Sequence, residues 1–380
     1  MSLRKDFIQE VLSGELSKSK LCAKYGISRV TGDKWLKRYF EGNGLSDKSR
    51  KPFRSPNKTP AEVENLILEA REAHKAWGPR KLVTYLRNEG YTSLPSPSTV
   101  CTILKRNGLV SQEASQASTA YKRFVRELPN QLWQADFKGN FKMENGLLCF
   151  PLAIIDDCSK FSFCLDAKAN EQGKGVHESF LRIFELYGLP LAILCDNGNP
   201  WGVSQSVGYT RFDVWFMQLD ILPIHGRPGH PQTQGKVERF NRTLNEEVLK
   251  YTTIKCLGHA QKEFDEFRDC YNNVRPHGAL DLNTPASRHT LSKRPLPKTI
   301  QEWIYPSDYI VRKVRGHGDI SLRRKYYYLG DAFIGLHVGL RESSISGCFN
   351  VYYRNFRVAR IKVDEKGFLS RRPYRVEEDD

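Results

Sequence analysis

Hydrophobic positions in the first 40 residues recur at helical spacing. Apolar residues of the segment 3–12 fall on one face of a helix, and Gly14 ends it. A segment that begins at Ser17 and a second from Val30 to Tyr39 predict two more helices, with Gly26 in the turn between them. The pattern therefore predicts three short helices at the N-terminus.

The spacing of the last two helices is typical of a helix-turn-helix, whose second helix lies in the major groove of DNA. Ala23 is expected where the helices approach each other, with Ile27, Val30 and Leu36 in the core. The exposed positions that would face DNA are Arg29, Thr31, Lys34 and Arg38. A three-helix bundle without a DNA-binding role has the same periodicity, so both interpretations stay open at this point.

A second helical unit follows a basic, proline-rich spacer at residues 48–58. Its three predicted helices cover residues 60–76, 78–88 and 96–107, with Pro60 at a first helical position. It is either a second helix-turn-helix or a helical packing domain. The polar residues that follow, up to residue 130, are rich in alanine and serine and predict a linker.

Beyond residue 130 the pattern changes from that of helices to that of strands. An α/β fold around a mixed sheet is predicted by this order of elements. The predicted elements are strands at 133–137, 147–155, 161–165 and 191–195, and helices at 175–187, 211–219 and from Gly235 toward Tyr251.

After residue 305 short apolar runs separated by glycines predict a small antiparallel β-barrel. Its strands are expected at 309–315, 325–329, 337–341, 348–353 and 356–362. Basic and aromatic residues follow one another from Arg323 to Tyr327, which suits contact with DNA or with another subunit. A packing module is the alternative. The fold class is thus multidomain, with all-α helix-turn-helix units, an α/β core and a small β-barrel.

The sequence divides into six predicted parts. They are a helix-turn-helix unit at 1–47, a second helical unit at 57–112, a linker at 113–130, the α/β core at 131–290, the barrel at 305–365 and an acidic-ended tail at 366–380.

Charge is unevenly distributed over these parts. The 380 residues include 59 Lys and Arg against 43 Asp and Glu, a formal net charge of +16. Residues 1–130 carry a net charge of +11, residues 131–295 are neutral and residues 296–380 carry +5. A charge that served solubility alone would not divide this way. We therefore expect the basic ends to hold a polyanion such as DNA around a neutral catalytic body.

Several classes of protein are disfavoured by composition. No apolar run approaches the length of a membrane span, and the N-terminus lacks the apolar segment of a signal peptide. The nine cysteines form no Cys-x-x-Cys pair, so neither a zinc ribbon nor a disulfide framework is indicated. A reducing cytoplasm, without a membrane partner, is the expected location.

Three carboxylates stand at the ends of predicted core elements. Asp136 and Asp196 lie at strand ends, and Glu238 lies in the helix that begins near Gly235. Carboxylates that converge are unfavourable without a counter-charge, because each raises the pKa of the others. Mg²⁺ prefers such oxygen ligands. A pair of these ions can activate a water or a 3′-hydroxyl in phosphodiester chemistry.

The motifs around these carboxylates resemble those of the DDE transposases of bacterial insertion sequences, which share a ribonuclease-H-like core with retroviral integrases. The resemblance covers residues 1–290 and implies that Asp136, Asp196 and Glu238 are the catalytic metal ligands for two Mg²⁺ ions, for which Mn²⁺ can substitute. It also implies that Lys236 and Arg239 contact DNA phosphates. The motifs are Trp133-Gln-Ala-Asp-Phe137, Cys195-Asp-Asn-Gly198, Gly229 to Thr243, Tyr271 to His277, and Thr284-Pro285.

By this resemblance the chain is expected to bind the terminal inverted repeats of a mobile element, cleave DNA to release 3′ ends and transfer them to target DNA. It would work in the bacterial cytoplasm, at the nucleoid, as a dimer or higher assembly on double-stranded DNA. A metal-dependent nuclease without strand transfer is one alternative. A helix-turn-helix transcriptional regulator is the other, and the presence of all three carboxylates weighs against it.

The sequence departs from the family pattern in two places. The interval from Asp196 to Glu238 is longer than usual, which an insertion at 201–210 would explain, and Asn199-Pro200-Trp201 follows the Asn-Gly pair. Other polar residues have plainer interpretations. Asp156 and Asp157 are typical of a turn, His277 of packing and Cys195 of a buried apolar residue, whereas His230 either touches DNA or shapes its loop.

Overall fold

The computed structural model describes residues 3–47, 58–110, 126–196, 198–202, 208–226, 235–363, 368–370 and 374–375. The chain forms two compact units, Met1–Thr59 and Pro60–Asp380. Most of the spacer and of the linker, His230, half of the expected insertion and the end of the tail lie outside the described residues. Among the residues that are described, no helix has the length and apolar character needed to cross a bilayer.

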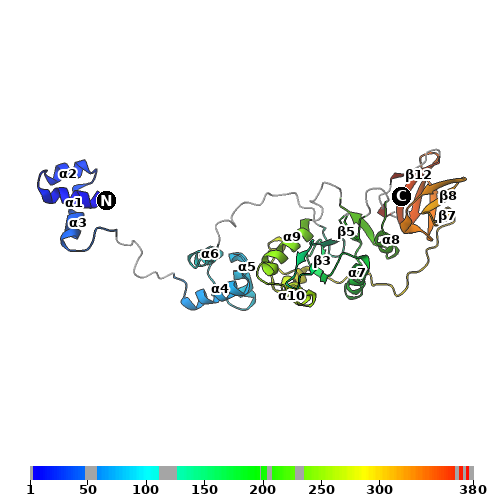
Figure 1. The fold of residues 1–380 in the computed structure, drawn as a ribbon, viewed down its shortest axis with the longest axis horizontal. Coiled ribbons are helices and arrows are strands. Elements are labelled where there is room, and N and C mark those ends of the chain that lie inside the picture. The colour runs from blue at the N-terminus through cyan, green and yellow to red at the C-terminus, as the bar shows by residue number, and fades with distance from the viewer. Residues whose placement is uncertain are drawn as a thin grey trace. The chain divides into compact units, whose positions relative to one another are not determined.

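The first unit consists of three helices around a small aromatic core (Figure 1). They are α1 (Leu3–Ser13), α2 (Lys18–Lys24) and α3 (Arg29–Phe40). The hydroxyl of Ser28 caps α3 by accepting a hydrogen bond from the Thr31 backbone N–H at 3.1 Å. The helix-turn-helix predicted from the spacing is therefore present.

Two details of that prediction are wrong. Ala23 is exposed, and Val30 is 77% exposed on α3, so neither packs between helices. The close approach falls at Gly32 instead, where a Cβ would lie 2.9 Å from Cys22 Sγ and 3.0 Å from the Phe7 ring. A glycine inside a helix was not expected at a contact point, because its helix propensity is low.

The second unit begins with a helical bundle formed by α4 (Ala61–Ala73), α5 (Pro79–Asn88) and α6 (Pro97–Arg106). Proline occupies the first turn of α5 and of α6, where no intrahelical N–H is lost. Trp77 is fully buried in this bundle and stacks on His74, with ring centroids 3.7 Å apart.

This bundle is tied to the α/β core through one carboxylate. Glu247 accepts a hydrogen bond from the Trp77 indole at 3.1 Å, and it pairs with Arg275 at 2.9 Å. Cys270 and Val274 extend the apolar side of the same contact. Burial, with a smaller contribution from the charge of Arg275, lowers the pKa of the nearby Lys81 to about 8.

The core is a mixed sheet in the order β4–β3–β1–β5–β6, with the short β2 (Phe141–Lys142) also pairing with β3. β1 (Trp133–Phe137) runs antiparallel to β3 (Leu148–Asp156) and parallel to β5 (Ala192–Cys195). β4 (Ser162–Lys168) pairs antiparallel with β3, and β6 (Leu222–His225) pairs parallel with β5. This arrangement places the end of β1 beside the end of β5.

Helices cover both faces of the sheet (Figure 1). Leu152 and Ile154 of β3 pack with α7 (Gly173–Tyr187) and α8 (Arg211–Gln218). Ala153 and Ile155, which alternate with them, pack with α9 (Gly235–Leu244) and α10 (Leu257–Asp269). Single π-helical turns, Asn245–Leu249 and Cys270–Val274, extend α9 and α10. A 3₁₀ turn, Gly278–Leu280, and α11 (Pro285–Arg288) end the core.

The C-terminal region is a sheet with a separate hairpin. The sheet order is β13–β12–β11–β10–β7, with β14 on β12, and the hairpin is β8–β9. The described strands do not join into a closed ring, so the barrel stays a prediction. The strands are β7 (Ile310–Lys313), β8 (Asp319–Leu322), β9 (Lys325–Tyr328), β10 (His337–Glu342), β11 (Cys348–Tyr353), β12 (Phe356–Lys362), β13 (Phe368–Ser370) and β14 (Tyr374–Arg375). A 3₁₀ turn, Asp331–Phe333, precedes β10.

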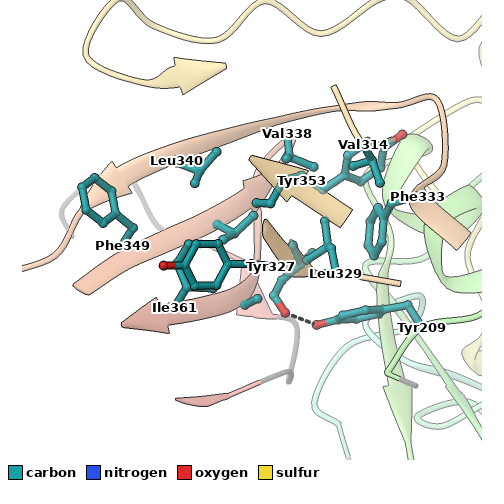
Figure 2. Packing of buried hydrophobic residues seen from close by; sticks show 14 of the residues in the cluster. Tyr209, Val314, Tyr327, Leu329, Phe333, Val338, Leu340, Phe349, Tyr353 and Ile361 are labelled. Carbon is teal, nitrogen blue, oxygen red and sulfur yellow. Dashed lines mark hydrogen bonds between the residues drawn. The ribbon is translucent and has the colours of Figure 1, made fainter. Parts of the chain in front are cut away.

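A hydrophobic cluster joins this sheet, the hairpin and α8 (Figure 2). Tyr209, just before α8, enters the cluster and donates a hydrogen bond to the Val358 carbonyl at 2.7 Å. Gln218 at the end of α8 donates to the Tyr353 hydroxyl at 2.9 Å. The C-terminal region is thus packed onto the core and is not a loose appendage.

Candidate active site

Strand register brings two of the three predicted carboxylates together. Gln134 of β1 lies opposite Leu194 of β5 in the parallel register. Two residues further along each strand, Asp136 and Asp196 stand at the same edge of the sheet. The third, Glu238, is exposed in the first turn of α9, which packs against β1 and β3.

The electrostatics of Asp136 show that the other two carboxylates lie near enough to act on it. Burial, then the negative charges of Asp196 and Glu238, raise the pKa of Asp136 to about 7. The Asn241 side-chain amide opposes this shift by donating to Asp136 Oδ2 at 3.0 Å. A carboxyl group this crowded is poised to accept a cation or a proton.

Asp196 is held by its neighbours on the loop after β5. Burial raises its pKa, while the Gly198 backbone N–H and the nearby His225 favour the charged form. Its Oδ1 atom is buried without a hydrogen-bond partner. A Cβ on Gly198 would lie 2.8 Å from Asp196 Oδ2, so the close approach needs glycine. This close contact explains why the third residue of the Asp-Asn-Gly motif is a glycine.

A buried polar network anchors the start of α9. The Gln134 side chain accepts a hydrogen bond from the Val237 N–H at 3.3 Å and donates to Asp157 at 2.7 Å. Asp157 in turn forms an ion pair with Lys236, whose side chain is largely buried. The structure therefore gives Lys236 an internal partner where sequence analysis expected a DNA phosphate. Its neighbour Arg239 is exposed.

The acidic pair after β3 has two different roles. Asp156 accepts hydrogen bonds from the N–H groups of Asn130 at 2.9 Å and Ser159 at 2.6 Å, so the turn predicted for it is confirmed. Asp157 instead joins the network of α9. Sequence analysis missed this role, because nothing local shows that Lys236 and Gln134 face it.

A half-buried histidine and a buried aspartate near Asp196 were not predicted from the sequence either. His225, the last residue of β6, lies 3.2 Å from the Asp196 carbonyl and 2.7 Å from Asp213 Oδ1. Asp213 completes a capping box with Thr210 at the start of α8. Although burial opposes it, Asp213 raises the pKa of His225. A Ser/Thr-x-x-Asp cap was a signal that sequence analysis could have used.

The predicted DNA-facing residues of α3 lie in the first unit, away from this network in sequence. Arg29 and Lys34 are exposed, whereas Thr31 and Arg38 are half-buried. The Thr31 hydroxyl lies 2.9 Å from that of Ser28, so Thr31 belongs to the helix cap.

Within the part of the chain that the structure describes, no three His, Cys, Asp or Glu side chains lie close enough to hold a metal ion. Asn197 and residues 227–234, which flank Asp196 and Glu238 in the sequence, lie outside the described residues. The structure therefore brings the three carboxylates into electrostatic contact but does not show a formed metal site.

Comparison with protein families places known domains on these parts. Residues 126–231 and 219–285 match the integrase core domain. Residues 3–53 match a helix-turn-helix domain, and residues 31–104 match a homeodomain-like domain. Residues 309–369 match the C-terminal domain of the IS481 family of transposases.

Individual proteins with similar sequences come from bacterial insertion elements. A 39.2 kDa uncharacterized protein of IS476 from Xanthomonas euvesicatoria is 25% identical over 268 residues, which cover 66% of this chain and 74% of the relative. A 31.7 kDa uncharacterized protein of IS407 from Burkholderia multivorans is 25% identical over 232 residues, covering 59% of this chain and 80% of the relative. Among solved structures, the HTLV-2 integrase catalytic core in complex with magnesium is 23% identical, with a TM-score of 0.33, and covers 43% of this chain and 99% of that one.

The integrase core domain and the insertion-element relatives support the class of protein, a DDE polynucleotidyl transferase acting on DNA. Helix-turn-helix domains before that core, a transposase C-terminal domain after it and relatives from insertion elements support a DDE-type transposase of an insertion sequence.

Proposed function

We propose that this transposase binds the terminal inverted repeats of its element through α1–α3 and α4–α6, cleaves DNA to expose a 3′-hydroxyl and transfers that end to target DNA. The observation that carries the proposal is the placement of Asp136 and Asp196 at the same edge of the sheet, with Glu238 in the first turn of α9, which packs against β1. The raised pKa of Asp136 supports it. Like charges held close together at the edge of a sheet are costly for the fold and are typical of a functional site.

The chemistry of this donor set fits a divalent cation. Asp196 Oδ1 is buried without a partner, and Asp136 is surrounded by negative charge that a cation would offset. Asp136, Asp196 and Glu238 would hold two Mg²⁺ ions, or Mn²⁺ in their place. When bound, such ions supply activation of a water or 3′-hydroxyl and stabilisation of the leaving oxygen.

The protein's own residues position these carboxylates. Asn241 orients Asp136 through its amide, and the Gly198 N–H holds the carboxylate of Asp196. The contact of Gln134 with the Val237 N–H fixes the first turn of α9 beside β1. Arg239, which is exposed one position after Glu238, would bind a DNA phosphate near the reacting bond. Because two element ends must be processed together, we expect a dimer or higher assembly on DNA.

The test is Asp136→Asn in the full chain, assayed on a duplex that carries an element end. We expect cleavage to be lost and binding of the duplex to be retained, since the amide removes one ligand and one charge. Glu266→Gln, on the exposed face of α10, is the matched control and should cleave normally. Persistent cleavage by Asp136→Asn would refute the assignment.

A pre-cut end separates a transposase that joins DNA from a nuclease that only cuts. The wild-type chain should covalently join a pre-cut 3′-hydroxyl end to a second duplex. Cleavage without any joined product would favour the nuclease.

A further inference from the structure

The β8–β9 hairpin turns on two arginines in an unusual backbone conformation. Leu322 pairs with Lys325, so Arg323 and Arg324 form a two-residue turn. Their φ angles are +51° and +64°. Two-residue turns of this kind favour Asn-Gly, because residues with a bulky side chain are disfavoured at positive φ. Two arginines at the tip therefore make the turn less stable than it could be.

The inner face of the hairpin holds it in place without help from the tip. Tyr327 lies in the hydrophobic cluster (Figure 2), and its hydroxyl donates to the Val363 carbonyl at 2.9 Å. Ile320 and Leu322 are buried in the same cluster. Since these residues anchor both strands, packing does not account for the arginines at the turn.

The outer face of the hairpin is cationic and aromatic. Tyr326 is 63% exposed, and the Arg315 guanidinium lies 4.5 Å from its ring centroid. Arg312 reaches across from β7 and donates to the Ser321 carbonyl at 3.0 Å. Two acids lie at this face. Asp319 is paired with Arg315 at 3.4 Å, and Asp331 accepts a hydrogen bond from the Tyr328 hydroxyl at 3.0 Å. Once the two arginines of the turn are included, guanidinium groups are in excess on this face.

Arg323 and Arg324 extend this face at the tip, where both are exposed. The Arg323 guanidinium lies 5.3 Å from the ring centroid of the buried Phe349, which limits the directions it can take. Guanidinium groups bind phosphate oxygens through two parallel hydrogen bonds, and orientation by a ring lowers the entropy lost on binding. Strained residues that packing does not require are a mark of a functional site.

We propose that the tip, Arg323 and Arg324, together with Arg312, Arg315 and Tyr326, forms a contact site for the phosphate backbone of double-stranded DNA. The inference rests on the proposed function and deepens it by assigning one DNA contact to the C-terminal region. Because backbone phosphates carry no sequence information, this contact is independent of DNA sequence.

The decisive variant combines Arg323→Asn with Arg324→Gly in the full chain. It supplies the pair that such turns favour, so the melting temperature should stay the same or rise. Affinity for a duplex should fall about tenfold, and the slope of log affinity against log salt should become shallower by about two, as two phosphate contacts are lost. A role in folding alone would lower both the melting temperature and the affinity. An unchanged or higher melting temperature with a lower affinity therefore indicates a DNA contact.

Two controls accompany it. Arg323→Lys with Arg324→Lys keeps both charges and should retain most of the affinity and of the salt slope. Lys293→Gln with Lys298→Gln removes two exposed charges elsewhere and should leave the slope unchanged. A similar loss with this second control would mean that net charge, and not the hairpin, is responsible, and would overturn the proposal.

Each remaining outcome is informative. An equal loss on an element-end duplex and on a random duplex supports the backbone contact, and a loss confined to the element end overturns it. Unchanged affinity and slope, or lost affinity with a lower melting temperature, also overturn it. If the wild-type chain bound neither duplex, the proposed function itself would fail, whereas a fully active hairpin variant would remove this inference alone.

Discussion

Gly198 shows how the side chain of Asp196, a proposed catalytic acid, limits which residue can stand next to it. A Cβ would approach Asp196 Oδ2 to 2.8 Å, and the N–H of Gly198 supports the same carboxylate. Because the atom in conflict belongs to a short side chain that can rotate, an added methyl would displace Asp196 and leave the fold intact. A substitution at this position should therefore change the geometry of the site more than it changes the stability of the fold.

Gly198→Ala should lower the cleavage rate about 100-fold, since a misplaced ligand of this kind costs roughly that factor. The melting temperature and DNA affinity should barely change. Gly258→Ala, at a position where a Cβ meets open space, is the control for an added methyl. Normal cleavage by Gly198→Ala would show that the position of Asp196 does not matter to the reaction.

His277 is a second residue whose surroundings fix its chemistry. It is buried and lies with Nε2 3.1 Å from the Tyr271 carbonyl, so this nitrogen carries the proton. Arg275 approaches the other nitrogen. Burial, reinforced by the charge of Arg275, lowers the pKa of His277 to about 3. The packing role predicted for this histidine is confirmed by its burial.

The pH dependence of stability follows from that low pKa. The unfolded chain takes up a proton at His277 below about pH 6.5, whereas the folded chain does not until about pH 3, so the free energy of unfolding falls as pH falls through this window. When the pH falls from 7 to 5, the free energy of unfolding of His277→Gln should decrease by about 2 kcal/mol less than that of the wild-type chain. Denaturant unfolding at the two pH values measures this difference, and equal losses would contradict the assignment.

At the scale of elements, the first turn of α9 depends on partners in two strands. Gln134 and Asp157 come from β1 and the turn after β3, and they hold Val237 and Lys236 on either side of the helix start. Because Glu238 follows Val237, the position of a proposed catalytic acid is fixed by a network that contains none of the three proposed metal ligands.

Lys236→Met would leave Asp157 as a buried charge without its ammonium partner. We expect a loss of about 3 kcal/mol in the free energy of unfolding, and Asp157→Asn in the same chain should restore much of it. Chemical denaturation of the single and double variants tests this. If Lys236 served DNA alone, stability would be unchanged and only affinity would fall.

At the scale of the whole molecule, we assign recognition of the DNA sequence and catalysis to different parts of the chain. The basic N-terminal region carries α3, with Arg29 and Lys34 exposed, while the core is electrically neutral. Sequence preference is therefore expected to depend on α1–α3 and α4–α6, and the chemical step on the α/β core.

Arg29→Ala with Lys34→Ala should reduce the ratio of affinities for an element-end duplex and a random duplex about tenfold or more, since each lost base contact costs roughly 1–3 kcal/mol. Lys5→Ala, exposed on α1, removes a charge without touching α3 and should preserve the ratio. A competition binding assay gives both numbers. An unchanged ratio for the α3 variant would exclude this helix from base reading.

Much of the fold was predictable because its periodicities are long and regular. The helices of both N-terminal bundles, the strands β1, β3 and β5, and α8 and α9 all lie close to their expected bounds. β6 was not predicted, because it has four residues and includes Pro223. β8 was missed for a related reason, since Arg323-Arg324 does not look like a turn.

The residues of the candidate site were predictable only where they form short motifs of consecutive residues. The three carboxylates sit in short motifs, and the parallel register of β1 and β5 explains why two of them meet. Asp157, more than 70 positions from Lys236, could not be matched with it from sequence, because burial of a charged side chain leaves no periodic signal. The exposure of Val30 was unpredictable for a comparable reason, as Gly32 had taken the contact instead.

The contacts of the Glu247 carboxylate determine which parts of this protein can be exchanged for those of another transposase. It accepts from Trp77 of the α4–α6 bundle and pairs with Arg275 of the core, so neither part can be replaced without leaving a buried group unmatched. The core of the first unit, among the described residues, is built from its own side chains. A chimaera joined near residue 59 should therefore tolerate α1–α3 from another transposase. A chimaera joined between α6 and β1 should fold poorly unless the replacement bundle has a tryptophan that donates to Glu247 as Trp77 does. Exchange of specificity between elements is expected at the first joint and not at the second.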